Sequence, residues 1–273
     1  MKEDDMFIRR KSTGFLGCAV LIALTGLLSA SRADEDFVPD VRQYPCGRAA
    51  HAIAIDGRLD DAAWKDAPRV TCFYDTQNDG RSAPIPREQI AVSFLYDETN
   101  LYVGAVIRDR DIVYDPEHLN KDKETLFLDG DVFELFVQPD ANSPRYFEIH
   151  VNPNNAAWDA AFPARNYMRF LDPTKWNSGL KSAVTVRGTA NELDEDESWT
   201  VEMAVPLSAL AARNGRRFAV QPGALWRFSV CLYDYSYYYD DCGNNGALKY
   251  YSSSKYPRLD FHLRGAFNFL EFK

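Results

Sequence analysis

The residues best suited to chemistry lie in two neighbouring stretches of alternating polar and apolar residues, 131–138 and 146–152. Successive side chains of a β-strand point to opposite faces, so each stretch predicts a strand with one polar and one apolar face. If the two strands pair through the turn at 139–145, their polar side chains form one continuous outward surface. That surface would hold Glu134, Tyr146, Glu148, His150 and Asn152.

This combination of carboxylates, an imidazole, an amide and a ring suits saccharides. Sugar hydroxyls need fixed donors and acceptors, and sugar C–H faces stack on aromatic rings. Trp158 and Trp176, together with Tyr235 at the start of the tyrosine-rich stretch 234–260, are further candidate rings. The simpler interpretation is the solvated face of a half-buried sheet, which alternating polar residues usually indicate.

Catalysis is an alternative because Glu134 and Glu148 could form the carboxylate pair of a glycosidase. The separation of the two carboxylates distinguishes glycosidase mechanisms, and the sequence does not set it. The chain has no G-x-S-x-G, H-E-x-x-H or phosphate-binding loop motif. We therefore assign no catalytic residue and expect binding without hydrolysis.

Aspartates near turns are candidate metal ligands. Asp129 and Asp131 flank a glycine, and similar groups occur at 109/111 and 234/240/241. Carboxylate oxygens are hard ligands that suit calcium in an exported protein, so a structural calcium ion is the expected cofactor. Capping of turns is the simpler explanation of the same residues.

The N-terminal segment predicts export. Basic residues at 9–11 precede an uncharged apolar run at 14–28, and small residues follow it up to position 33. This is the layout of a cleavable signal peptide over residues 1–33, and the run is shorter than the ~20 residues of a membrane-spanning helix. We expect a secreted or periplasmic protein with no stable membrane insertion after cleavage.

Composition excludes several classes of protein. The 273 residues are 46% apolar and 26% charged, as in a packed globular domain. The net charge is −9, and removing residues 1–33, which hold five positive and three negative residues, leaves −11. An acidic chain lacks the surplus of Lys and Arg that nucleic-acid binding requires, so no nucleic-acid partner is expected.

Four cysteines remain after residue 33, and an even number in an exported chain is compatible with two disulfides. Four cysteines allow three pairings. Local pairing, Cys46 with Cys72 and Cys231 with Cys242, is the preferred one.

The dominant period along the chain is two, which predicts an all-β fold. Residues 89–96 and 101–107 flank a four-residue polar turn and predict a hairpin. Helical signals are limited to 60–65 and 207–210. Without long crossover helices the strands favour an antiparallel β-sandwich over 49–273, after an irregular arm at 34–48. The other expected strands are 50–55, 70–74, 131–138, 145–152, 183–189, 198–205, 225–233 and 267–272.

Four motifs, in order and spacing, resemble the signatures of family 9 carbohydrate-binding modules: Ile53–Trp64, Tyr96–Val103, Gly130–Val137 and Trp199–Pro206. The resemblance extends from about residue 48 to the strand at 267–272. It implies a β-sandwich that binds saccharides without hydrolysing them. Such modules often carry structural calcium and are often attached to enzymes that degrade xylan or cellulose.

The resemblance also implies site residues. Members clamp a sugar end between two tryptophans and bind it with polar residues of adjoining strands. Those polar positions correspond here to Glu134, His150, Asn152 and Cys231, of which Glu134 and Asn152 keep the family's residue type. Leu128 stands where one clamping tryptophan is expected, and the region 250–254 offers tyrosines for the other.

The function expected from the sequence is a secreted module that recognises plant or microbial polysaccharide or oligosaccharide in carbohydrate catabolism. Its partners would be a saccharide and a separate glycoside hydrolase. Two alternatives stay open. One is an enzyme that uses Glu134 and Glu148, and the other is an envelope scaffold that has lost sugar binding.

Overall fold

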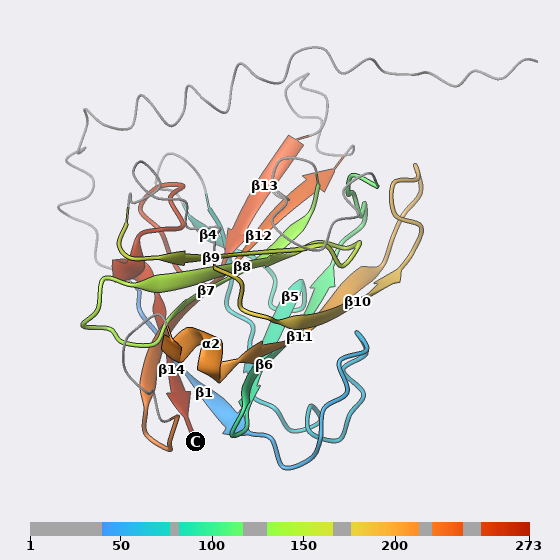
Figure 1. Cartoon of the computed structure of the whole chain (residues 1–273). Helices are drawn as coiled ribbons and strands as arrows, with labels where there is room; N and C mark the ends of the chain where they lie inside the picture. Colours follow the sequence, from blue (N-terminus) through green and yellow to red (C-terminus); the bar gives the residue numbers. More distant parts are fainter. Residues whose placement is uncertain (1–39, 77–81, 117–129, 166–175, 213–219, 237–246) are drawn as a thin grey trace, which may run out of the picture. The chain divides into compact units, whose positions relative to one another are not determined.

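The computed structural model describes residues 40–76, 82–116, 130–165, 176–212, 220–236 and 247–273. These residues lie in the compact unit Pro39–Lys273 and are mainly β-strands (Figure 1). Their regular helices are the short α2 (Leu207–Ala212) and the 3-10 turn η5 (Arg264–Ala266). Within these ranges no helix has the length and hydropathy needed to cross a bilayer. The predicted all-β sandwich is confirmed.

One layer of the sandwich is an antiparallel sheet. Its strands are β10 (Lys181–Arg187), β11 (Ser198–Pro206), β6 (Asn100–Arg108), β5 (Ile90–Tyr96) and β2 (Arg69–Val70), in that spatial order. The predicted hairpin is confirmed as β5 and β6. Its turn is closed by Asp97, whose side chain accepts the backbone N–H groups of Thr99 and Asn100 at 2.6 and 2.7 Å.

The other layer is built around the long strand β12 (Leu225–Ser236). On one side β12 pairs with β7 (Val132–Gln138), followed by β8 (Tyr146–Val151) and β9 (Ala157–Phe162). On its other side lie β14 (Asn268–Phe272) and β13 (Ala247–Ser252). The short strands β3 (Tyr74–Asp75) and β4 (Ala83–Pro84) extend the sheet beyond β13.

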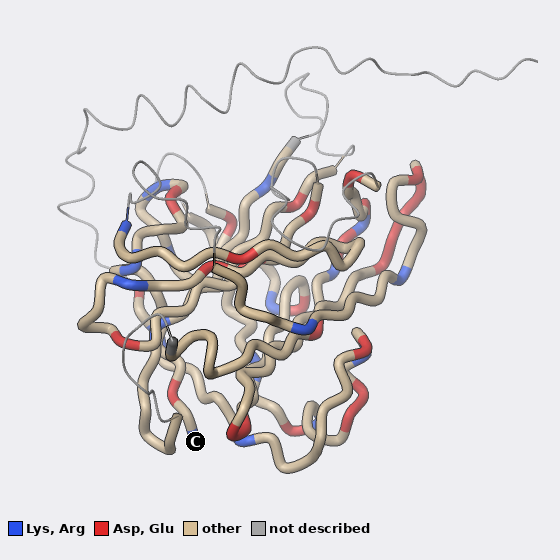
Figure 2. Tube along the Cα trace, in the orientation of Figure 1, with Lys and Arg blue, Asp and Glu red and all other residues tan. Residues whose placement is uncertain are grey.

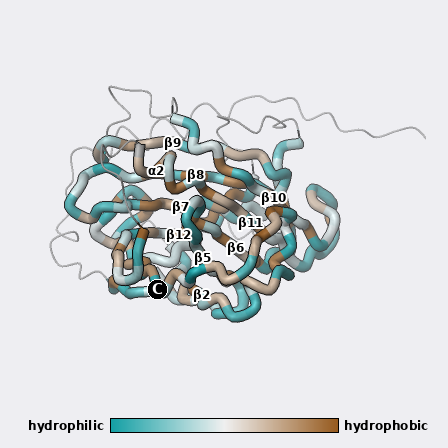
Figure 3. Tube along the Cα trace, turned by 60° about the horizontal axis from the view of Figure 1, so that its bottom comes forward, coloured by the Kyte–Doolittle hydropathy of each residue, from teal (hydrophilic) through white to brown (hydrophobic). Residues whose placement is uncertain are grey.

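The main core lies between the two layers. Phe133, Leu135 and Val137 of β7 face it, as the alternation predicts, and so do Phe147 and Ile149 of β8. Hydrophobic stretches run along the strands in the middle of the molecule, whereas the connections are more hydrophilic (Figure 3). The faces of β7 and β8 that point away from this core are therefore free to carry polar groups.

Acidic residues are frequent along the turn that joins β10 and β11 (Figure 2). Glu192, Asp194, Glu195 and Glu197 are exposed there. Arg110 pairs with Glu195, and Arg187 lies 3.5 Å from Glu197. Exposed pairs of this kind contribute little to stability.

The buried carboxylate of Glu202 connects the motifs Ile53–Trp64 and Trp199–Pro206 through hydrogen bonds. Glu202 of β11 accepts hydrogen bonds from the backbone N–H groups of Asp56 (2.9 Å) and Gly57 (3.0 Å) and from Nε1 of Trp64 (2.8 Å). Trp64 packs with Leu95 and Tyr102 in a small apolar cluster outside the first sheet. Segment 53–64 therefore covers this sheet as a loop.

Four local expectations differ from the structure. The strand expected at 70–74 is divided into β2 and β3, because the two short strands pair in different layers, β2 with β5 and β3 with β13. Residues 43–48 of the predicted irregular arm form strand β1 (Gln43–Arg48), which runs parallel to β14 and to β5 and joins the layers because it pairs with the open edges of both. Residues 50–55 are not a strand, since Ile53 and Ile55 pack against the cluster around Trp64. Residues 60–65 form turns and no helix.

The predicted disulfide between Cys46 and Cys72 is not formed. Cys46 is a free thiol buried in the main core, and Cys72 is a half-buried free thiol. Cys231 is also free, and Cys242 lies outside the described residues. The Cys46 side chain is enclosed in the main core, whereas Cys72 lies half-buried between β2 and β3.

Candidate functional site

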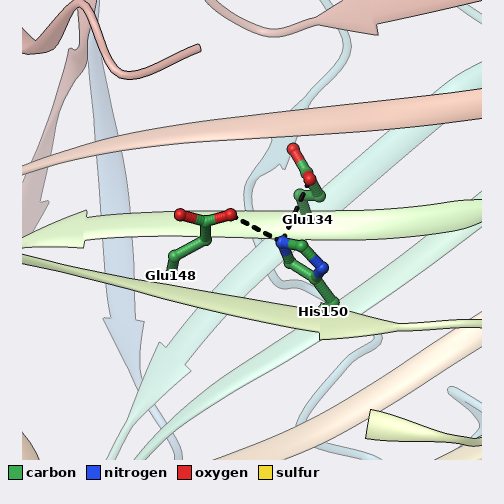
Figure 4. A group of neighbouring side chains, drawn as sticks. All are labelled: Glu134, Glu148 and His150. Atoms are coloured by element: carbon green, nitrogen blue, oxygen red, sulfur yellow. Dashed lines mark hydrogen bonds and ion pairs between the residues drawn. The ribbon is translucent and has the colours of Figure 1, made fainter. Parts of the chain in front are cut away.

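Glu134, Glu148 and His150 meet on the face of β7 and β8 that points away from the main core (Figure 4). Glu134 lies directly opposite His150 in the ladder, and Glu148 lies two residues before His150 on the same face. His150 Nε2 is 3.0 Å from Glu134 Oε1 and 2.8 Å from Glu148 Oε1. The predicted pairing of the two strands is thus confirmed.

These three side chains are buried, contrary to the expected open surface. The exposed fractions are 2% for Glu134, 5% for Glu148 and 0% for His150. A second apolar cluster covers this face because the C-terminal segment folds over it and contributes Tyr256, Phe261 and Phe267. The expectation of an open saccharide surface at these residues is therefore wrong for this structure.

The positions of Glu134 and Glu148 also show whether they could act as the carboxylate pair of a glycosidase. Glu134 and Glu148 both point one oxygen at the same imidazole nitrogen. A glycosidase instead places its two carboxyl groups on either side of a bond in an open site. As arranged here, the two carboxylates flank an imidazole ring.

Burial and charge together set the ionisation of this cluster. Burial alone lowers the pKa of His150, but the carboxylates of Glu134 and Glu148 outweigh it and raise this pKa to about 9. Burial raises the pKa of the Glu134 carboxyl, while His150 opposes that shift. The ionisation of Glu134 and the ionisation of His150 therefore depend on each other.

Tyr146 and Asn152 have structural partners. The Tyr146 ring is buried, stacks on Phe162 at 4.9 Å between centroids, and brings its hydroxyl to 2.8 Å from Nδ1 of His262. The Asn152 side chain accepts the backbone N–H of Ala156 and so closes the turn between β8 and β9. Neither side chain lies on an open surface. Tyr146 packs against neighbouring rings, and Asn152 is held in the turn between β8 and β9.

The two predicted stacking tryptophans are also buried. Trp158 lies opposite His150 in the pairing of β8 with β9, and the two rings are 4.5 Å apart between centroids. Trp176 packs against Phe147 in the main core, with the ring centroids 4.8 Å apart. Trp176 therefore presents no exposed ring face for a sugar, because it fills the interior.

A second cluster of buried acids involves Asp131. Its carboxylate lies with those of Asp109 and Asp234, and one ligand atom from each lies within 4.8 Å of the others. Burial raises the pKa of Asp109 to about 6. Burial and the two neighbouring carboxylates raise the pKa of Asp131 well above its usual value. Each of the three acidic groups expected from the sequence, 109/111, 129/131 and 234/240/241, thus supplies one aspartate to this cluster. Asp129 lies outside the described residues.

Tyr235 belongs to the surroundings of this acidic cluster. Its backbone N–H donates to Asp131 Oδ1 at 2.7 Å, and its side chain is half-buried on β12. The tyrosines that follow it at 237–239 and the family-related position Leu128 lie outside the described residues. The structure thus links Tyr235 to the acidic cluster through its backbone, and its role as a sugar-stacking ring stays a prediction.

Cys231 and the tyrosine region also differ from an open clamp. Cys231 stands opposite Glu134 in the pairing of β12 with β7 and is fully buried. Tyr250 packs its ring against Tyr233 at 5.1 Å and against Phe261 at 6.3 Å. Serines 252–254 are buried as well. This region therefore fills space beneath the C-terminal segment.

An open pocket lies elsewhere, along β9. We call it the β9–β10 pocket; it has a volume of about 330 Å³ and is lined by Asn155, Ala157, Trp158, Asp159, Asn177, Leu180, Lys181 and Ser182. Trp158 and Asp159 both line this pocket. Because adjacent side chains of a strand face opposite ways, a pocket that contacts both must run along the edge of β9.

Hydrogen bonds hold the wall of this pocket in place. Asn155 has a φ of 56°, in the left-handed region, and its side chain accepts from Ser182 Oγ at 2.7 Å. Asp159 accepts both the backbone N–H and the hydroxyl of Ser178 at 2.7 Å. Lys181 and Asn177 are exposed at its rim. The pocket thus combines an indole ring, amides and an ammonium group.

The sequence indicates Trp158 as a candidate ring but does not predict the pocket. Its lining comes from a turn, an edge strand and the segment before β10. The hydrogen bonds that join these segments connect residues up to 27 positions apart in the sequence. The only signal in the sequence is the asparagine-rich punctuation at 152–155 and 177. That signal predicts turns but does not place them side by side.

Comparison with known proteins identifies one matching family and several solved structures of similar fold. The family model described as "Carbohydrate family 9 binding domain-like" matches residues 55–224. No curated protein has a sequence that matches this chain.

Among solved structures, a candidate carbohydrate-binding protein from Bacteroides uniformis has a TM-score of 0.57 at 14% identity, with 85% of this chain and 99% of that chain covered. A family 9 carbohydrate-binding module from Caldicellulosiruptor kristjanssonii in complex with glucose has a TM-score of 0.51 at 13% identity, with 84% and 95% covered. The same organism's module in complex with cellotriose has a TM-score of 0.48 at 12% identity, with 85% and 94% covered. Sequence identities this low establish likeness of fold only.

Proposed function

Since the chain belongs to the carbohydrate family 9 binding domain-like family, we propose that it binds saccharides without hydrolysing them, in the β9–β10 pocket. The observation that carries this proposal is the pocket itself. It is open, whereas the carboxylate and imidazole groups first expected to bind a sugar are buried.

The chemistry of the pocket suits one or two sugar units. Its volume of about 330 Å³ lies at the lower end of small-molecule sites, which span roughly 300–1,000 Å³. Trp158 lines the pocket with only 7% of its surface exposed, so its apolar contact with sugar C–H groups would be small. The amide of Asn177 and the ammonium of Lys181 at the rim can bind hydroxyls.

We choose glucose-containing probes first because a module of similar fold was solved with glucose. Xylo-oligosaccharides are the second series, and plant and microbial polysaccharides are the natural ligands that we propose. We also propose that residues 1–33 direct export and that the domain acts in carbohydrate catabolism beside a separate glycoside hydrolase. N-terminal sequencing of the exported protein tests the first part, with Asp34 as the expected first residue.

The test is calorimetric titration of the full mature chain with glucose, cellotriose and xylotriose, followed by pull-down on insoluble polysaccharide. Lys181→Ala removes one polar group from the rim, and Asn177→Ala removes another, which also accepts the N–H of Gly179 at 2.7 Å. Loss of one hydrogen bond of about 1 kcal/mol weakens binding roughly fivefold. Arg187→Ala is the matched control, because Arg187 is an exposed cation at the other end of the same strand.

The proposal is supported if both rim variants bind more weakly while the control binds like the wild type. It fails if a broad saccharide array retains nothing, which would favour the scaffold alternative. Equal binding by all four proteins would place the sugar somewhere other than this pocket. Turnover of an oligosaccharide that Glu134→Gln abolishes would instead support the enzyme alternative.

We further propose that Asp109, Asp131 and Asp234 hold a structural calcium ion. Three buried carboxylates within 4.8 Å repel one another, and a cation between them would offset that repulsion. Their oxygens are the hard ligands that calcium prefers. The ion would stabilise the junction of β7 and β12, where Asp131 accepts the N–H of Tyr235.

A further inference from the structure

We propose that Glu134, Glu148 and His150 bind a divalent transition-metal ion of the zinc class. The proposal does not depend on saccharide binding in the β9–β10 pocket. It uses the buried cluster that neither the pocket nor the acidic calcium site includes.

The first observation is the convergence of two carboxylates on one nitrogen. Glu134 Oε1 lies 3.0 Å and Glu148 Oε1 lies 2.8 Å from His150 Nε2 (Figure 4). An imidazole nitrogen carries at most one hydrogen, so the two oxygens must share it. A metal ion in place of that hydrogen would be coordinated by His150 Nε2 and by one oxygen of each glutamate.

The second observation concerns the other two oxygens. Glu134 Oε2 and Glu148 Oε2 are buried, and within the part of the chain that the structure describes neither has a hydrogen-bond partner. The residues themselves are only 2% and 5% exposed. Burying an acceptor without a partner costs free energy, and more so for a charged group. A metal ion would bind these carboxylates directly, with one or both oxygens.

The charge of the cluster leads to the same conclusion. A divalent ion would offset the formal charge of the two glutamates, with the imidazole nitrogen as a neutral ligand between them. The other nearby basic group is His262, whose Nδ1 is 3.8 Å from Glu148 Oε2 and bonds instead to the Tyr146 hydroxyl at 2.8 Å. A divalent ion would therefore neutralise a group that lies beneath an apolar cover.

The distances require only small movements. Zinc binds nitrogen and oxygen at about 2.0–2.2 Å, so ligands at tetrahedral angles stand about 3.4 Å apart. The observed separations of 2.8 and 3.0 Å would have to open by about half an ångström. Water or a second carboxylate oxygen would fill the remaining position.

The ligands stand on rigid supports. Glu134 and His150 are directly opposed across β7 and β8, and the Trp158 ring packs against the imidazole. Two-strand supports of this kind hold a site more firmly than loops do. Because one ligand is an imidazole nitrogen, the site favours zinc-class ions over calcium or magnesium, which prefer oxygen ligands.

The experiment uses the full mature chain, stripped with a chelator and reloaded with zinc chloride during refolding, because the site is buried. Bound zinc is measured by elemental analysis after dialysis, and cobalt replaces zinc for an absorption spectrum. Glu134→Gln and Glu148→Gln keep the side-chain size and are expected to lose the ion. His51→Gln, an exposed histidine, and Asp131→Asn, at the calcium cluster, are the matched controls.

The expected result is roughly one zinc per chain in the wild type and both controls, and a tenfold or greater loss of affinity in the two glutamine variants. Wild-type protein should also melt at a higher temperature with zinc. If a glutamine variant does not fold, the cobalt spectrum of the wild type decides, since a tetrahedral site with a nitrogen ligand gives intense visible bands. The proposal is overturned if the wild type retains no zinc, if folded Glu134→Gln and Glu148→Gln retain it, or if cobalt gives only an octahedral spectrum.

Discussion

Replacing Glu202 with alanine should cost this domain much of its stability. Glu202 is buried, and its carboxylate accepts three hydrogen bonds, from the N–H groups of Asp56 and Gly57 and from Nε1 of Trp64. Those donors lie in the loop that covers the first sheet. Glu202→Ala removes their common acceptor.

The size of the loss follows from the buried donors. The bonds from Gly57 and Trp64 are fully buried, whereas the one from Asp56 is partly exposed and can be replaced by water. Each orphaned buried donor costs about 1–3 kcal/mol, so Glu202→Ala, which orphans two of them, should lower the free energy of unfolding by about 2–6 kcal/mol. Glu202→Gln keeps one acceptor oxygen and should cost about half as much.

Urea denaturation, followed by tryptophan fluorescence and by circular dichroism, measures this loss. Glu197→Ala is the control, because Glu197 is an exposed glutamate just before the same strand and should change stability by no more than about 0.5 kcal/mol. If Glu202→Ala loses no more than the control, the Glu202 hydrogen bonds do not anchor the loop. A transition that splits into two steps would instead show that the loop unfolds separately from the sandwich.

Two further predictions concern acid sensitivity and metal removal. Four donors outweigh burial and lower the pKa of Asp97, so its contribution is present above the ordinary value of 3.8 and is lost as pH falls through the lowered value. The stability difference between wild type and Asp97→Asn, about 1 kcal/mol at pH 7, should therefore shrink below pH 3.8 in urea titrations; a constant difference would contradict the assignment. Chelation followed by restoring zinc should leave the melting temperature several degrees below that of the untreated wild type, with recovery on adding calcium but not magnesium, because three buried carboxylates lose their cation. Asp131→Asn should abolish this response and Glu134→Gln should not; equal responses in both would exclude the acidic cluster as the calcium site.

Strand pairing was the most predictable part of the fold. The polar turn at 97–100 sets the register of β5 and β6, because it brings short alternating segments next to each other. The pairing of β7 with β8 follows in the same way through the turn at 139–145, and it brings Glu134 opposite His150 as expected. Strand β1 was not predictable, because it pairs with strands almost 50 and more than 220 residues away.

The exposure of the candidate site could not be predicted in the same way. Alternation shows that Glu134, Glu148 and His150 share a face, but not what covers that face. The cover comes from residues more than 100 positions further along, among them Tyr256 and Phe267. Its docking depends on side-chain packing that has no periodic signature.

The sequence by itself thus determined the local rules: which residues alternate, which turns close hairpins, and which polar side chains share a face. These depend on backbone geometry over a few residues, which residue type controls directly. Only the tertiary structure decided which face is sealed and which edge stays open, as at β9 and β10, and that three distant aspartates meet. Such outcomes depend on the packing of segments that are remote in sequence, where many weak contacts act together.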